Sequence, residues 1–156
     1  MPSSLHPPRR SARWCWWFLL LATAGMLAWI LLRPGTAHDG LNLIPLQEIA
    51  RVLRPLRQAE APLQHPAFRY LLRNVGGNIA AFLPLGLAVV GLMRHRGAWR
   101  ALKWAVGVGF FVSLSIELLQ LIVPRRVTDI DDLLFNTVGA LLGGVLGLLI
   151  LRRRPG

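Results

Sequence analysis

Four long runs of apolar residues, separated by short polar and basic segments, dominate the hydrophobic pattern of the chain. They cover residues 14–32, 77–93, 104–123 and 133–151. Each run has about 17 to 20 residues, enough for an α-helix to cross ~30 Å of hydrocarbon. The pattern therefore predicts an all-α, polytopic membrane helix bundle with four transmembrane helices.

The only long connection, residues 33–73, contains a second helical pattern. Its apolar positions fall on one side of a helix that Pro45 is well placed to open; they are Leu46, Ile49, Val52, Leu53 and Leu56. The other side is polar, with Gln47, Glu48, Arg51 and Arg54. This pattern predicts a short amphipathic helix that lies in the membrane interface or re-enters the bilayer. A small helix packed over the bundle is the alternative.

The two ends of the chain are basic tails. Residues 1–13, rich in Pro, Ser and Arg, predict a disordered cytoplasmic tail, and residues 152–156 a short basic tail. Between them, residues 14–151 form one membrane domain. The first apolar run is longer than the 7–15 residues of a signal-peptide core, so we expect a retained anchor. Cys15 is the only cysteine, which excludes an intramolecular disulfide and a thiolate metal cluster; we expect no metal site and no cofactor.

Charge and composition fit a membrane protein rather than a nucleic-acid-binding one. Of the 156 residues 54% are hydrophobic and only 16% charged, and the net charge is +11. The basic residues flank the apolar runs instead of forming one face, which argues against a nucleic-acid partner. The positive-inside rule favours an inner (plasma) membrane protein with both termini cytoplasmic. Residues 33–73 and 124–132 are then extracytoplasmic. Ten basic residues fall on the cytoplasmic side under this assignment: Arg9, Arg10, Arg13, Arg94, Arg96, Arg100, Lys103, Arg152, Arg153 and Arg154.

Three of the runs carry a polar stripe at helical spacing. In the second run Asn74 and Asn78 are four residues apart, on one helix face. The stripe of the third run consists of Gly109, Ser113, Glu117 and Gln120. The fourth begins with Asp129, Asp132 and Asn136 and continues on the same face with Gly139, Gly143 and Gly147. Glycine at every fourth position favours close helix packing.

Antiparallel connectivity brings these polar residues to the same membrane face. An ionisable side chain in a bilayer costs at least a few kcal/mol, so it faces a partner or a site. We therefore expect a ligand-binding site at the outer face, with nine candidate residues: Asn74, Asn78, Glu117, Gln120, Arg125, Arg126, Asp129, Asp132 and Asn136. Asp131 points off the stripe and is expected to matter little.

Each stripe also has a purely structural interpretation. Asn74 and Asn78 can join helices, and Thr128 or Asp129 can cap the fourth helix. Arg125 and Arg126 can anchor the membrane interface or pair with the aspartates. Glu117 can form a salt bridge with Arg73 or Arg125. These alternatives stay open at the level of sequence.

At its polar positions the sequence resembles those of the VanZ-like family of bacterial membrane proteins. The resemblance covers about residues 42–147 and rests on four pieces: Asn42-Leu-Ile-Pro45, Asn78-Ile-x-x-Phe82-x-Pro84-x-Gly86, Glu117-Leu-x-Gln120, and Arg126-x-x-Asp129-Ile-Asp131-Asp132-x-x-x-Asn136-x-x-Gly139. The family is named for a protein that gives low-level resistance to teicoplanin, a lipidated glycopeptide antibiotic. The resemblance implies a cell-envelope role and leaves the mechanism open.

Three functions are considered. The first is a non-enzymatic protein that binds a lipid-linked cell-wall precursor or a lipoglycopeptide at the outer leaflet, because arginines and amides suit phosphate and carboxylate groups. The second is an intramembrane enzyme acting on a lipid-linked envelope substrate, with Glu117, Asp129 and Asp132 as acid/base groups or ligands of a hard cation. No nucleophile–base pair and no HExxH motif supports the second. A third function, transport, requires more helices or an oligomer. The remaining expected partner is membrane lipid, and the oligomeric state is left open.

Overall fold

The computed structural model describes residues 10–32, 40–122 and 127–152. The elements follow one another as α1 (Arg10–Leu32), β1 (Gly40–Asn42), α2 (Gln47–Gln58), η1 (Pro62–Gln64), α3 (Pro66–Leu71), η2 (Leu72–Gly76), α4 (Gly77–Met93), η3 (Arg94–Arg96), α5 (Ala98–Gln120), β2 (Val127–Asp129) and α6 (Ile130–Arg152). The all-α class is confirmed.

Four helical segments of the described chain are long and apolar enough to cross a membrane. They are Arg13–Leu32, Pro66–Arg96, Ala98–Gln120 and Ile130–Leu151. The second begins earlier than expected, because α3 and the π-helical turn η2 continue into α4. Pro66 opens this helix, and the ring Nδ1 of His65 accepts the Ala67 N–H at 3.1 Å. The second half of the 33–73 connection is therefore helical.

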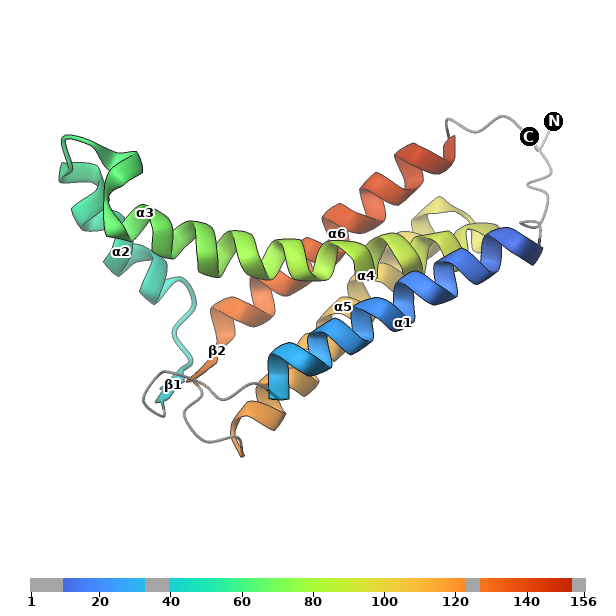
Figure 1. The fold of residues 1–156 in the computed structure, drawn as a ribbon, viewed down its shortest axis with the longest axis horizontal. Helices are drawn as coiled ribbons and strands as arrows, with labels where there is room; N and C mark the ends of the chain where they lie inside the picture. The colour runs from blue at the N-terminus through green and yellow to red at the C-terminus, as the bar shows by residue number, and fades with distance from the viewer. Residues whose placement is uncertain (1–9, 33–39, 123–126, 153–156) are drawn as a thin grey trace.

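The amphipathic helix of the first connection is present as α2. Its apolar residues Ile49, Val52 and Leu56 are half-buried, whereas Arg54 and Arg57 are exposed. The helix begins at Gln47 and packs beside α3 (Figure 1). Its position in the membrane interface stays a prediction.

A short parallel β-ladder, absent from the sequence expectation, joins the first connection to the start of α6. β1 pairs with β2 in the register Gly40↔Val127, Leu41↔Thr128 and Asn42↔Asp129. Segments far apart in the sequence are thereby placed side by side. Strands of three residues are too short to show a period-2 pattern, so the sequence could not predict them.

The most extensive helix contact is between α4 and α6, which run in the same general direction and cross at an angle (Figure 1). Glycines make it: a Cβ placed on Gly86 would overlap the carbonyl oxygen of Ala140, and one on Gly143 would overlap that of Leu83. Gly139 meets the backbone of Ile79 in the same way. Two glycines of the expected stripe, Gly139 and Gly143, thus make backbone contacts, whereas Gly147 packs against the side chains of Leu87 and Val90. Close dispersion contacts of this kind stabilise helix packing in lipid.

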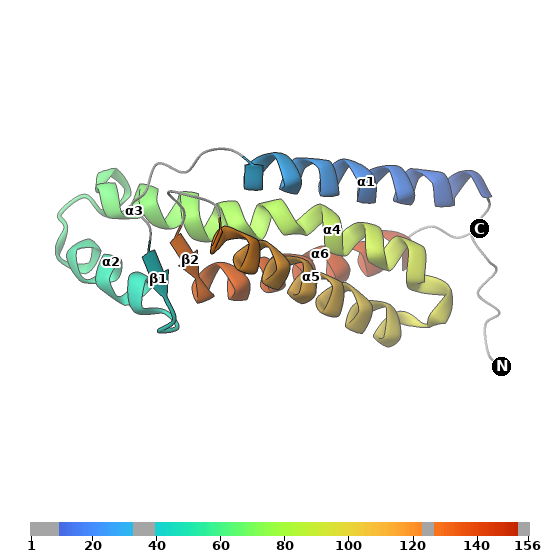
Figure 2. The same ribbon diagram turned by 90° about the horizontal axis from the view of Figure 1, so that it is seen from below.

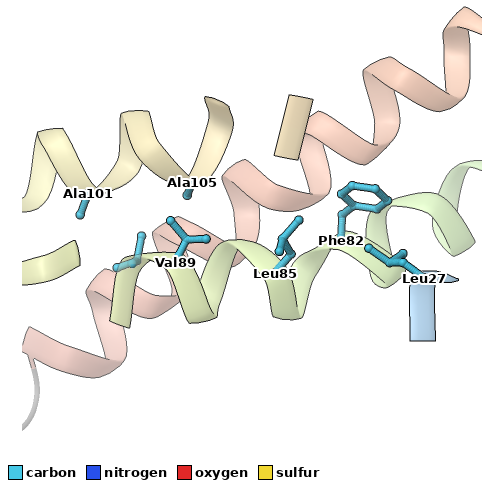
Figure 3. Packing of buried hydrophobic residues seen from close by; sticks show 7 residues of the cluster. Leu27, Phe82, Leu85, Val89, Ala101 and Ala105 are labelled. Atoms are coloured by element: carbon cyan, nitrogen blue, oxygen red, sulfur yellow. The ribbon is translucent and has the colours of Figure 1, made fainter. Parts of the chain in front are cut away.

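A small apolar core lies along α4. Phe82 and Val90 are only 2% and 0% exposed, and they cluster with residues of α1 and α5 (Figure 3). Ala101 and Ala105 of α5 are fully buried, four residues apart, and let α5 approach α4. Outward-facing residues such as Phe18 and Phe111 are exposed and apolar, as expected of surfaces that face lipid.

The helix bundle has two distinct ends. β1, β2, α2, the start of α6 and the end of α5 lie at one end, as both views show (Figures 1 and 2). We call this the ladder end. The start of α1, the turn between α4 and α5, and the end of α6 lie at the other, which we call the turn end. The polar stripes meet at the ladder end.

Candidate functional site

The buried carboxylate of Glu117 lies at the centre of the polar cluster. Its side chain is 5% exposed, on the face of α5 that also buries Gly109 and Ser113. Its Oε2 accepts the backbone N–H of Asp129 at 3.0 Å, and its carbonyl oxygen accepts the Thr128 hydroxyl at 3.3 Å. These bonds tie the end of α5 to β2. The stripe predicted for the third span is thus a buried helix face.

Asp129 caps α6. Its Oδ1 accepts the backbone N–H of Asp131 at 2.9 Å, which satisfies one of the free donors at the helix start. The same oxygen accepts the side-chain Nδ2–H of Asn42 at 3.0 Å, across the β1–β2 ladder. The capping interpretation is therefore confirmed for Asp129, a residue also expected to bind ligand.

Asp131 contradicts the expectation that it matters little. It is 3% exposed, and its Oδ1 accepts the backbone N–H of Leu46 at 2.6 Å. Leu46 has a φ of 62°, in the left-handed region that a leucine enters only at a cost of about 1–2 kcal/mol. Asp131 therefore holds a strained turn just before α2. This role could not be predicted from the sequence, because helical spacing gives the face of α6 but not the loop that packs against it.

Replacing Asp131 with alanine should loosen the first connection. The Leu46 N–H loses its acceptor, so we expect the free energy of unfolding in detergent to fall by about 2 kcal/mol. Proteolysis within residues 47–58 should accelerate. The exposed Glu60, changed to alanine, is the control and should shift stability by less than ~0.5 kcal/mol. Equal stability of both variants would rule out the Asp131 contact as a structural clamp.

A side-chain hydrogen bond joins α4 to α6. The Asn78 Nδ2–H donates to Oδ1 of Asp132, so the predicted stripes of the second and fourth spans do meet. Asn74 lies half-buried in η2, one turn before Asn78. No hydrogen bond from its side chain to this cluster is seen in the described part of the chain.

One turn deeper, polar residues form a second layer. Asn136 is 5% exposed, and its Nδ2–H donates to the hydroxyl of Ser113 at 2.9 Å, between α6 and α5. Three buried acceptor oxygens of the described residues have no hydrogen-bond partner: Gln120 Oε1, Asp131 Oδ2 and Asn136 Oδ1. An acceptor of this kind costs about 1–3 kcal/mol while it stays unpaired, so each of the three oxygens has an open position for a hydrogen-bond donor.

The described residues make this site acidic. Asp129 and Asp132 both lie close enough to Glu117 for their charges to repel its carboxylate. Arg73, considered as a salt-bridge partner of Glu117, is exposed on η2, and Glu117 accepts a backbone N–H instead. Arg125 and Arg126 lie outside the described residues. Among the described His, Cys, Asp and Glu residues, no group of three is placed to hold a metal ion.

The arrangement suits a ligand that supplies hydrogen-bond donors. Carboxylate and amide oxygens accept from ammonium, amide and hydroxyl groups, and the bonds to charged groups are the stronger ones. Fold and site together define a multi-pass membrane protein whose polar cluster lies at one end of an apolar helix bundle.

The chain belongs to the VanZ/LLP1 family, whose model matches residues 14–151. The match covers all four apolar helices and every candidate site residue. No protein of curated function and no solved structure matches the chain.

Proposed function

We propose that the protein binds the head group of an amphiphile at the outer leaflet of the bacterial plasma membrane. The ligand is a lipid-linked cell-wall precursor or a lipoglycopeptide, and binding contributes to teicoplanin-type glycopeptide resistance. Family membership supports the envelope role. The observation that carries the proposal is the set of three buried acceptor oxygens without a hydrogen-bond partner, on Gln120, Asp131 and Asn136.

The acceptors match the chemistry of both ligand classes. Peptide and sugar head groups offer amines, amide N–H groups and hydroxyls, which can fill the open positions on Gln120, Asp131 and Asn136. In the proposal Arg125 and Arg126 add contacts to the phosphate or carboxylate of the same head group. The polar cluster thus recognises the head group through several hydrogen bonds at once.

Apolar side chains near the cluster supply a surface for the lipid part. Leu43 and Ile44, next to β1, are 61% and 59% exposed, and Ile122, beyond α5, is 77% exposed. An acyl chain that enters the bilayer beside these side chains gains about 0.8 kcal/mol for each CH₂ that leaves water. Lipidated ligands should therefore bind better than their bare head groups.

Binding of a teicoplanin-type lipoglycopeptide to purified protein in nanodiscs tests the proposal. We expect saturable binding above that of empty nanodiscs. Acetylation of the ligand's free amine should weaken it by about tenfold, because a charged donor to a buried carboxylate is lost. Removal of the acyl chain should weaken it further. Equal binding of the acetylated and free amines, or binding no greater than to empty nanodiscs, would refute the donor-binding site.

The second candidate is an intramembrane enzyme acting on a lipid-linked envelope substrate. The observation in its favour is that Glu117 and Asp132 extend from neighbouring helices into one cluster, whereas Asp129 is occupied as a helix cap. Two neighbouring carboxyl groups can act as general acid and base. Turnover of a lipid-linked precursor by the purified protein, abolished in Glu117→Gln, would establish this activity in place of simple binding.

The proposal requires the ladder end to face outward. A cysteine at the exposed Leu63, in a Cys15→Ala background, should react with an impermeant maleimide in intact cells. A cysteine at the exposed Arg96, at the turn end, should react only after the membrane is opened. The reverse labelling pattern would invert the orientation and exclude an outer-leaflet ligand.

A further inference from the structure

A second polar surface lies at the turn end of the bundle, where the proposed function has no use for it. A shallow cavity of ≈ 200 Å³, largely open to its surroundings, lies there and is lined by Arg100, Lys103 and Trp104, all exposed and all from the first two turns of α5. Trp99 and Trp104 are 67% and 49% exposed. The Lys103 ammonium lies 5.3 Å from the centroid of the Trp99 ring, a cation–π contact that holds it beside the cavity.

The charge around this cavity is entirely positive. Arg94 and Arg96 of η3 precede α5, and the chain has no acidic residue from Ala61 to Ile116. Glu117 is 14 residues beyond Lys103, about 21 Å along the helix. Among the described residues no side chain caps the start of α5, so its first N–H groups add positive potential. The cavity therefore favours an anion.

Further along α5, beyond the basic residues, the exposed face of the helix is apolar. Trp104 and Phe111 are seven residues apart, on one helix face, and Phe111 is 66% exposed. Gly107 lies between them, and a Cβ placed on it would meet no atom within 4 Å. This face thus combines a basic cavity, an aromatic rim and an open apolar strip. That order matches a phosphate head group, a glycerol level and an acyl chain.

We propose that this cavity binds an anionic glycerophospholipid. Arg100 and Lys103 contact the phosphate, Trp104 packs at the glycerol level, and one acyl chain lies along the strip over Gly107. The inference is independent of the ligand at the ladder end.

Competition between two lipids with identical acyl chains tests the site. Purified protein is equilibrated with phosphatidylglycerol and phosphatidylcholine, and the retained lipid is counted by native mass spectrometry. Wild type should retain one phosphatidylglycerol with at least about tenfold preference, the effect expected of two nearby cations. Arg100→Gln/Lys103→Gln should lose the preference. The control Arg54→Gln/Arg57→Gln, which removes two exposed cations from α2, should keep it.

A variant of unchanged charge separates the groove from general electrostatic attraction. Gly107→Leu fills the strip, so it should reduce bound phosphatidylglycerol severalfold while the unfolding midpoint in lipid-free detergent stays at the wild-type value. Millimolar inorganic phosphate should not displace the lipid. Equal retention of the two lipids by wild type, an undiminished preference in Arg100→Gln/Lys103→Gln, unchanged lipid binding in Gly107→Leu, or full displacement by phosphate would each overturn the proposal.

Discussion

Gly143→Leu is expected to disrupt the fold more than a leucine at any lipid-facing glycine. A Cβ at Gly143 would overlap the Leu83 carbonyl oxygen, so α4 and α6 would have to separate along their closest contact. Overpacking costs typically about 1–3 kcal/mol, and a contact between backbones lies at the upper end of that range. For a chain of this size we expect the unfolding midpoint in detergent to fall by roughly 6–12 °C.

The matched control is Gly25→Leu. Gly25 lies in α1, and a Cβ placed on it would meet no atom within 4 Å, so leucine there should change stability by less than ~0.5 kcal/mol. Gly97 is a poor control because its φ of 94° strains any other residue. Equal melting curves for Gly143→Leu and Gly25→Leu would show that the close contact between α4 and α6 does not stabilise the fold.

The helices and their buried faces could be predicted because both follow from local regularities. Hydrophobic length fixes the spans, and a spacing of four residues fixes which side of α5 carries Ser113 and Glu117. The same spacing in α6 identified Gly139 and Gly143 as packing residues, which the Leu83 and Ile79 contacts confirm. Helical spacing shows which residues share one face of a helix, however, and not which neighbouring element packs against that face.

Contacts between distant segments could not be read from the sequence. Asn78 was expected on the polar side of the bundle, but its pairing with Asp132 depends on the contact of α4 and α6. The clamp of Asp131 on Leu46 and the β1–β2 ladder join residues 85 or more positions apart. The position of the cluster is therefore predictable from the sequence, whereas the role of Asp131 is not, because it exists only once the first connection folds back.

Glu117→Gln should separate ligand binding from stability. Glutamine keeps an acceptor oxygen for the Asp129 N–H, so the bond between α5 and β2 survives. It also removes the repulsion that Asp129 and Asp132 exert on the buried charge. The variant should therefore unfold at or slightly above the wild-type midpoint. Its affinity for a donor ligand should fall by about 10- to 100-fold, because hydrogen bonds to charged groups contribute ~1.5–3 kcal/mol.

Ligand affinity and unfolding midpoint should be measured together on Glu117→Gln, in the same nanodisc preparation, because the two values separate ligand binding from support of the fold. The exposed Glu60→Gln serves as the control and should match wild type in both readouts. For Glu117→Gln we predict weakened ligand binding with an unchanged or higher unfolding midpoint. If Glu117 instead neutralised an arginine, glutamine would leave that cation without its partner and lower stability. A Glu117→Gln protein that melts early yet binds its ligand as tightly as wild type would show that Glu117 only supports the fold.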